Sequence, residues 1–391
     1  MTYAGHRRII DVDSHVIELE DFLSEAAEAQ DRDLIPAMSD QNELPVSDAG
    51  IARGKELFAK RQSDPEIMAK FEASLMEARP NRWSRLGAFD PQERSHALDL
   101  MGFERQLVLP TFSFHQIAHV KDPAVLAAGA RALNRAMGGF CAHDQRLHAI
   151  GYVPLSLGPE AAGAILDEGL RAGCFTFMVD TNEPDPGARS FTHPDFDPIW
   201  ARFATARVPF VVHVAVNGHY QAVSPSFGNN GRPPLPLGGD VPASALGLVA
   251  IKNSAELFLS AMVMDGVFER HPELRGISME HGALWVPSWL QALDFAASAL
   301  KRFAPTRERP SDTVRRHLKF APFAGEPLAW IVGNIGPELL VFASDYTHPE
   351  GTSDPIGRFD AALAGCDQSA RDAFYHGNMA GLLERYDASP R

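Results

Sequence analysis

The sequence predicts an α/β protein in which eight parallel strands close into a distorted (β/α)8 TIM barrel. Short, nearly continuous apolar runs recur along the chain, as in strands buried on both faces of a parallel sheet. Segments with apolar residues at helical spacing separate most of these runs. Such alternation indicates a barrel or an open doubly wound sheet. With 391 residues, the chain is long enough to form a single barrel domain, residues 1–391, that carries insertions.

The apolar runs give the expected strands, and the periodic segments between them give the expected helices. The strands are expected at residues 6–12, 106–110, 149–154, 175–179, 209–214, 276–280, 318–321 and 339–344. The helices are expected at residues 124–142, 159–172, 196–206, 253–270, 285–303 and 370–386.

Two insertions interrupt the alternation of strands and helices. Residues 19–100, between the first and second strands, are charged and partly helical in pattern. Residues 217–252, after the fifth strand, are rich in Gly, Pro and Asn, which predicts a long loop without regular structure. A long loop in a compact enzyme is often a lid or a binding loop, although a surface excursion or a subunit contact is also consistent with it.

Composition excludes several classes of partner. The chain has 36 Lys and Arg against 50 Asp and Glu, a formal net charge of −14. This charge argues against binding to nucleic acid or to an anionic membrane, because both require a basic surface. The cysteines are few and widely spaced, which fits a reducing compartment, and no run approaches the ~18 apolar residues of a membrane span. We therefore expect a cytoplasmic protein that acts on a small molecule.

Histidine and aspartate residues fall where the expected strands end. Asp13 and His15, two residues apart after the first strand, point to the same side and offer one oxygen and one nitrogen to a divalent metal. His213 ends the fifth strand, His281 follows the sixth, and Asp345 follows the eighth. Because the C-terminal strand ends of a barrel meet at one mouth, these residues should share one site. Taken singly, each also has a structural explanation as a cap, a core histidine or a loop residue.

Several neighbouring residues are candidates for binding the substrate. Phe112 and His115 follow the second strand and are expected to line the pocket, and His219 lies in the long loop that could close over the mouth. His348, three residues after Asp345, would orient the substrate or the aspartate, or pack in its loop. Trp285 would either line the pocket or pack in the core.

Two glutamates lie next to these motifs. Glu18 is close enough to the first motif for a supporting role. Glu280 directly precedes His281, and the alternation of side chains along a strand predicts that it points the other way, toward the helix layer.

The motifs in this order resemble one family, the amidohydrolase-related proteins typified by aminocarboxymuconate semialdehyde decarboxylase. The resemblance covers most of the chain and rests on the stretches Asp11–His15, His213, His271–Leu274 with Glu280–Gly282, and Ser344–Pro349. It implies a distorted barrel with one divalent ion in its mouth, held by Asp13, His15, His213 and Asp345, and His281 as a catalytic histidine. The end of the fourth strand, Met178–Thr181, has no lysine to bridge a second metal, which favours a single ion.

The resemblance implies non-oxidative decarboxylation of an aromatic or unsaturated carboxylic acid. Asp345 or His281 would protonate the carbon that loses CO2, and no organic cofactor would be needed. The alternative is hydrolysis of an amide, ester, lactone or C–C bond by metal-activated water, with hydration as a third candidate. For two nitrogen and two oxygen ligands, Zn2+ is the first expectation and Mn2+ the second. Because the family is often dimeric, we also expect a homodimer.

Overall fold

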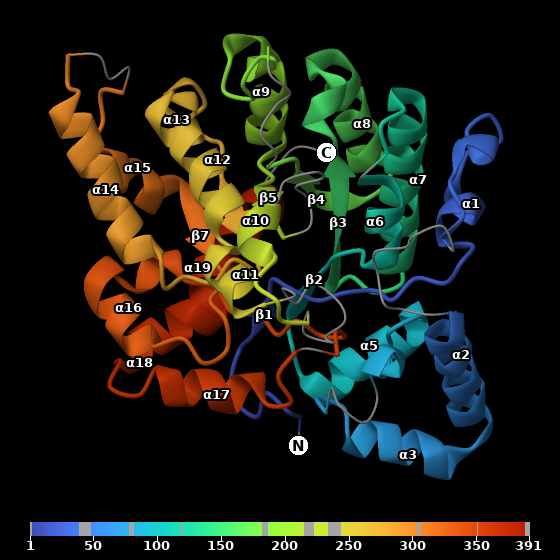
Figure 1. Cartoon of the computed structure of the whole chain (residues 1–391). Coiled ribbons are helices and arrows are strands. Elements are labelled where there is room, and N and C mark those ends of the chain that lie inside the picture. Colours follow the sequence, from blue (N-terminus) through green and yellow to red (C-terminus); the bar gives the residue numbers. More distant parts are fainter. Residues whose placement is uncertain are drawn as a thin grey trace.

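Seven parallel strands form one sheet in chain order (Figure 1). The computed structural model describes residues 2–38, 48–77, 82–118, 120–181, 187–214, 223–233, 244–302, 306–349 and 351–387. The strands are β1 (Ile10–Asp11), β2 (Arg105–Val108), β3 (Leu147–Val153), β4 (Cys174–Val179), β5 (Phe210–Val212), β6 (Gly276–Ser278) and β7 (Leu318–Phe320). Each coincides with one of the first seven apolar runs, within a few residues at its ends.

The eighth apolar run closes the sheet without forming a regular strand. Val341 N donates to Phe320 O over 3.1 Å, and Val12 N donates to Phe342 O over 3.0 Å. The segment therefore lies between β7 and β1, the two edges of the sheet. The predicted distorted barrel is confirmed, and its distortion lies where this last segment replaces a strand.

Helices surround the sheet, and Figure 1 shows α7, α8 and α9 side by side along one side of it. Their bounds are α6 (Phe112–Ala118), α7 (Pro123–Cys141), α8 (Pro159–Arg171), α9 (Asp197–Ala206), α12 (Asn253–Met264), α13 (Val267–Arg270), α14 (Val286–Ala299), α15 (Pro310–His317), α16 (Leu328–Ile335), α17 (Pro355–Ala362), α18 (Gln368–Asp372) and α19 (Asn378–Asp387).

Two expected helices are interrupted. The one expected at residues 253–270 divides into α12 and α13 because Gly266 adopts a left-handed conformation, φ 72°, which ends a helix. The one expected at residues 370–386 contains a π-helical turn, Ala373–Gly377, between α18 and α19.

The segment between β1 and β2 is partly helical, as predicted. It contains α1 (Phe22–Ala26), α2 (Asp48–Ser63), α3 (Pro65–Ala73) and α5 (Pro91–Met101), and Figure 1 shows α2 and α3 to one side of the sheet. A buried bidentate ion pair joins α2 to α5. Arg61 Nε and Nη2 donate to the two carboxylate oxygens of Glu93, each over 2.6 Å. Charged residues in this segment are therefore partly internal.

The segment after β5 contains regular structure, so the prediction of an irregular loop across 217–252 is wrong in part. It includes α10 (Pro225–Gly228) and α11 (Ala245–Ala250). Ser244 caps α11 by accepting a hydrogen bond from Gly247 N over 3.0 Å, which offsets the helix-breaking composition around it. His219 lies outside the described residues.

One stretch of the described chain, Ala245–Met264, is long and apolar enough to cross a membrane by length and composition alone. The expectation that no stretch comes near this limit is therefore wrong, because it considered uninterrupted runs only. The stretch is divided between α11 and α12, and a single helix that passes such a test is weak evidence for a membrane span. Leu248, Val249 and Leu257 are exposed on it.

The homodimer that we expect from the sequence stays a prediction.

Two adjacent glycines of α7 provide a test of how closely α7 packs against the end of α8. A Cβ at Gly138 would overlap the backbone carbonyl of Ala172, whereas one at Gly139 would meet no atom. We expect Gly138→Ala to lower the free energy of unfolding by about 1–3 kcal/mol. Gly139→Ala is the control and should raise it by about 0.5–1 kcal/mol, because alanine is the better helix former. Urea denaturation measures both, and equal effects would contradict the close packing.

Candidate functional site

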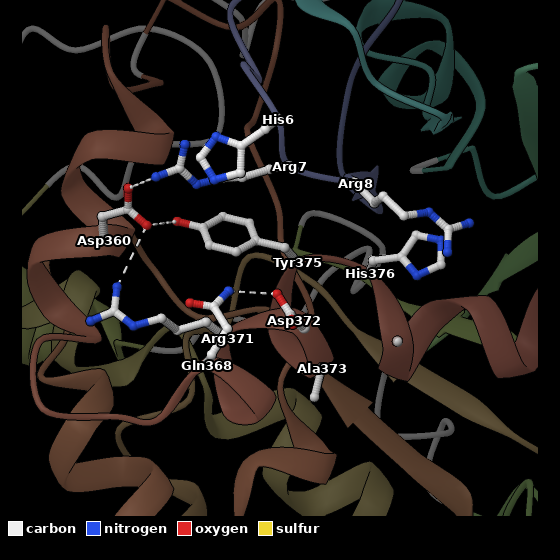
Figure 2. A pocket seen from close by; sticks show the side chains of 11 residues that line it. His6, Arg7, Arg8, Asp360, Gln368, Arg371, Asp372, Ala373, Tyr375 and His376 are labelled. Atoms are coloured by element: carbon white, nitrogen blue, oxygen red, sulfur yellow. Dashed lines mark hydrogen bonds and ion pairs between the residues drawn. The ribbon is translucent and has the colours of Figure 1, made fainter.

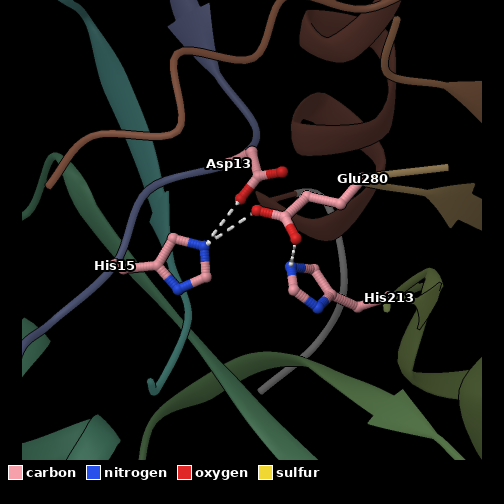
Figure 3. A group of neighbouring side chains, drawn as sticks. All are labelled: Asp13, His15, His213 and Glu280. Atoms are coloured by element: carbon pink, nitrogen blue, oxygen red, sulfur yellow. Dashed lines mark ion pairs between the residues drawn. The ribbon is translucent and has the colours of Figure 1, made fainter. Parts of the chain in front are cut away.

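Four potential metal-ligating side chains meet beyond the C-terminal ends of β1, β5 and β6 (Figure 3). They are Asp13, His15, His213 and Glu280, and their ligand atoms all lie within 4.8 Å of one another. His15 Nε2 is 3.2 Å from Asp13 Oδ1 and 3.7 Å from Glu280 Oε1. His213 Nε2 is 3.5 Å from Glu280 Oε2. We call these four residues the first donor group.

A second donor group overlaps the first and brings in the loop after the eighth segment. It consists of His15, Glu280, Asp345 and His348. Asp345 Oδ1 lies 3.7 Å from His15 Nε2 and 3.2 Å from His348 Nδ1. The imidazoles of His15 and His348 stack with their centroids 3.6 Å apart. The structure therefore brings together all four residues that the sequence proposes as metal ligands.

The two donor groups fit a divalent cation. Ligand atoms about 2.0–2.2 Å from one ion lie about 3–4 Å from each other, which matches the measured separations of 3.2 to 3.9 Å. Imidazole nitrogens and carboxylate oxygens are donors that Zn2+, Mn2+ and Fe2+ accept. Asp13, His15 and His213 are almost fully buried, and burying such groups together is costly unless they are paired or bind a metal.

Backbone carbonyls orient two of the imidazoles. His213 Nδ1 is 2.8 Å from Val214 O, and His15 Nδ1 is 3.3 Å from Pro110 O. A carbonyl only accepts hydrogen bonds, so in each ring Nδ1 carries the proton and Nε2 presents its lone pair to the donor groups. This is the usual support for a metal-ligating histidine.

Glu280 points into the site, so the prediction that it faces the helix layer is wrong. Its backbone is in the left-handed region, φ 56°, which breaks the alternation on which that prediction relied. Asp345 has the same unusual conformation, φ 54°. Left-handed backbone costs a residue other than glycine about 1–3 kcal/mol and concentrates at functional sites. The only hint in the sequence is a carboxylate next to His281 and Gly282 at a strand end.

His281 lies beside the donor groups and belongs to neither. Its Nδ1 is 3.1 Å from Ser278 Oγ, and its Nε2 is buried and makes no hydrogen bond within the described part of the chain. Burial, together with the neighbouring His213, lowers the pKa of His281 to about 3. The side chain is therefore neutral at neutral pH.

Glu18 supports the site through hydrogen bonds to the start of α6, as its position next to the first motif suggests. Its carboxylate accepts hydrogen bonds from the backbone N–H groups of Thr111 and Phe112, each over 2.8 Å, and from the Ser113 hydroxyl. Thr111 Oγ1 in turn lies 3.0 Å from His348 Nε2. Glu18 thus fixes the start of α6 and, through Thr111, the His348 ring.

Two buried arginines of the segment between β1 and β2 contact the loops that carry the site residues. They were not identified from the sequence. Arg94 donates to Gly87 O over 2.8 Å and to the carbonyl oxygen of His15. The guanidinium carbons of Arg85 and Arg94 lie 4.2 and 5.3 Å from the centroid of the Tyr346 ring. These cations therefore brace both the loop after β1 and the loop that carries Asp345.

The predicted substrate-binding residues lie in different environments, some near the donor groups and others in the core or outside the site. Phe112 contacts Trp83, with ring centroids 5.0 Å apart, and Trp83 in turn lies 6.0 Å from His348. Trp285 packs in the core against Trp289 and Phe320, and its indole N–H donates to Gly282 O over 3.0 Å. His115 lies on α6 next to Phe114, outside both donor groups.

A pocket of about 480 Å³ is lined by residues from both ends of the chain (Figure 2). Residues 6–8, which line it, precede β1, whereas the donor groups follow the strands. Its arginines are paired with carboxylates: Arg7 lies 2.5 Å from Asp360, and Arg8 lies 2.6 Å from Glu104. This pocket is therefore separate from the candidate metal site.

Solved structures share the fold over nearly the whole chain. An amidohydrolase from Mycobacterium avium subsp. paratuberculosis K-10 is 22% identical, with a TM-score of 0.72, and the match covers 97% of this chain and 99% of that one. 2,6-Dihydroxybenzoate decarboxylase from Rhizobium is 18% identical, with a TM-score of 0.65, and the match covers 97% of this chain and 99% of that one. 5-Carboxyvanillate decarboxylase from Novosphingobium aromaticivorans, complexed with manganese, is 15% identical, with a TM-score of 0.64, and the match covers 98% of each chain.

The search of curated proteins found no match to this sequence. The family model described as amidohydrolase, by contrast, matches residues 10–385 and so includes every residue of both donor groups. The match shows that the chain belongs to the amidohydrolase family, and the parallel sheet with candidate metal ligands at its C-terminal edge is consistent with it.

Proposed function

We propose that this protein is a metal-dependent, non-oxidative decarboxylase of an aromatic or unsaturated carboxylic acid. The observation that carries the proposal is the convergence of buried imidazoles and carboxylates at one mouth of the barrel. Two of the solved structures with this fold are decarboxylases of substituted benzoates, and one of them was crystallised with manganese. Trp83, whose ring lies next to those of His348 and Phe112, favours a flat substrate.

Asp13, His15, His213 and Asp345 are the proposed metal ligands. When bound, the cation would draw electron density from the carboxylate and an adjacent oxygen of the substrate, and so hold it in place. The protein carries a net charge of −14, which repels an acid, so the site needs this local positive charge.

We assign proton delivery to Asp345 because it is the most accessible carboxylate of the site. Its side chain is 24% exposed, whereas that of Asp13 is 2% exposed. The proton passes from the protonated carboxyl group of Asp345 to the carbon that bears the substrate carboxylate, and Asp345, now ionised, takes up another proton from solvent before the next turnover. The C–C bond then breaks, its electron pair restores the conjugated system, and CO2 leaves. His281, neutral through burial, suits donation of a hydrogen bond to a substrate oxygen.

The test combines metal content with product detection. We expect elemental analysis of the purified protein to find about one divalent ion per chain. We expect CO2 release from at least one member of a panel of hydroxybenzoates and muconate-type acids. Metal without CO2 would contradict decarboxylation and favour hydrolysis, to be assayed next on lactones, esters and amides. Failure to bind metal, even after reconstitution, would contradict the proposal as a whole.

A further inference from the structure

We infer that Glu280 is an additional protein ligand of the metal and that it raises the affinity of the site for Mn2+ relative to Zn2+. The inference rests on the proposed metal site and adds to it a residue that the expected ligand set does not include. Three observations support it: the position of the Glu280 carboxylate, the charge around it, and the chemistry of the enlarged donor set.

The carboxylate of Glu280 occupies the middle of the site. Together with His15, it belongs to both donor groups. Its Oε2 lies 3.5 Å from His213 Nε2, and its Oε1 lies 3.7 Å from His15 Nε2 and 3.9 Å from His348 Nδ1. The last two separations are too long for hydrogen bonds. One carboxylate at this spacing from three imidazole nitrogens is placed as ligands are placed around a shared cation.

Charge supports the same assignment. Asp13, Glu280 and Asp345 bring three carboxylates to one site, and the Glu280 side chain is only 11% exposed. Like charges held close together in a buried site destabilise one another. A divalent cation among them would turn this repulsion into attraction.

The enlarged donor set changes which metal the site suits. Zn2+ is commonly four-coordinate and would be satisfied by Asp13, His15, His213 and Asp345. Mn2+ accepts a larger, oxygen-rich set and so gains more from a third carboxylate. Removing the Glu280 carboxylate should therefore weaken Mn2+ binding more than Zn2+ binding.

The experiment compares metal-free wild type with Glu280→Gln. Binding of Mn2+ and of Zn2+ is measured by calorimetry, and bound Mn2+ is counted independently by the loss of its free-ion EPR signal. We expect the Kd for Mn2+ to rise by at least about tenfold, a loss seen even for residues that only support ligands, and the Kd for Zn2+ to rise less. We also expect the metal-free variant to melt at or above the temperature of metal-free wild type, because one of three mutually repelling charges is gone.

Glu326→Gln is the matched control. Glu326 accepts hydrogen bonds from the backbone of Ala283 and Leu284 in the same loop, so its replacement should lower the melting temperature and leave both metal affinities unchanged. If Glu280→Gln unfolds or melts lower without metal, Glu280 has a structural role and the inference is wrong. An unchanged Kd for Mn2+, or equal losses for both metals, would also overturn it. If wild type binds neither metal, the proposed function itself fails.

Discussion

Asp345→Asn is expected to lower the rate of decarboxylation by about 10²–10⁴-fold while the protein stays folded. The amide cannot deliver a proton, and it is a weaker ligand for a cation than the carboxylate. The fold should tolerate the change, because asparagine has the same shape and accepts the left-handed backbone, φ 54°, found at this position. The backbone hydrogen bond from Asp345 N to Asp13 O, 2.9 Å long, does not involve the side chain. The measurements are kcat, metal content and circular dichroism.

Two further variants serve as comparisons for that result. Asp167→Asn makes the same chemical change in a surface pair with Arg202 and should leave kcat unchanged. His281→Ala removes an imidazole outside both donor groups and should reduce kcat while the metal stays bound. A nearly normal rate in Asp345→Asn would remove Asp345 from the mechanism, and loss of metal from His281→Ala would make His281 a ligand.

Arg61→Met should lower the free energy of unfolding by about 3–5 kcal/mol, the cost of breaking a buried ion pair by removing one partner. The side chain of Arg61 is fully buried and that of Glu93 is 4% exposed. Without the guanidinium, the buried Glu93 carboxylate would accept hydrogen bonds from only two neutral donors among the described residues, Gly87 N at 3.0 Å and Gln62 Nε2 at 2.8 Å. Urea denaturation, followed by both fluorescence and circular dichroism, measures the loss.

The double variant Arg61→Met/Glu93→Leu separates the buried charge from lost packing. Because neither partner is then charged, it should be more stable than Arg61→Met alone, despite carrying two changes. A double variant less stable than Arg61→Met would mean that shape and packing at this contact matter more than charge.

The position of the candidate ligands on the strand ends could be predicted because each one depends on local features. Asp13 and His15 are two residues apart after an apolar run, and His213 ends another such run. The barrel topology then brings the strand ends together without any need to know side-chain contacts. Asp345 was found in the same way, although the segment before it is not a regular strand.

The rest of the site depends on backbone turns and on contacts between distant segments. The left-handed turn at Glu280 reverses the direction that strand alternation predicts. No local pattern connects Arg94 with the carbonyl of His15, because α5 and β1 meet only in the folded chain. Trp285 shows the same limit, since an aromatic residue near a strand end suits a pocket and a core equally well until its neighbours are known.

The contact between Arg94 and the His15 carbonyl links the folding of the segment between β1 and β2 to events at the mouth. That segment cannot be excised or exchanged as an independent module, because its arginines complete the loops that carry His15 and Asp345. By thermodynamic linkage, any molecule that binds at the mouth and requires these loops in place also stabilises α5, which carries Arg94, without touching that helix.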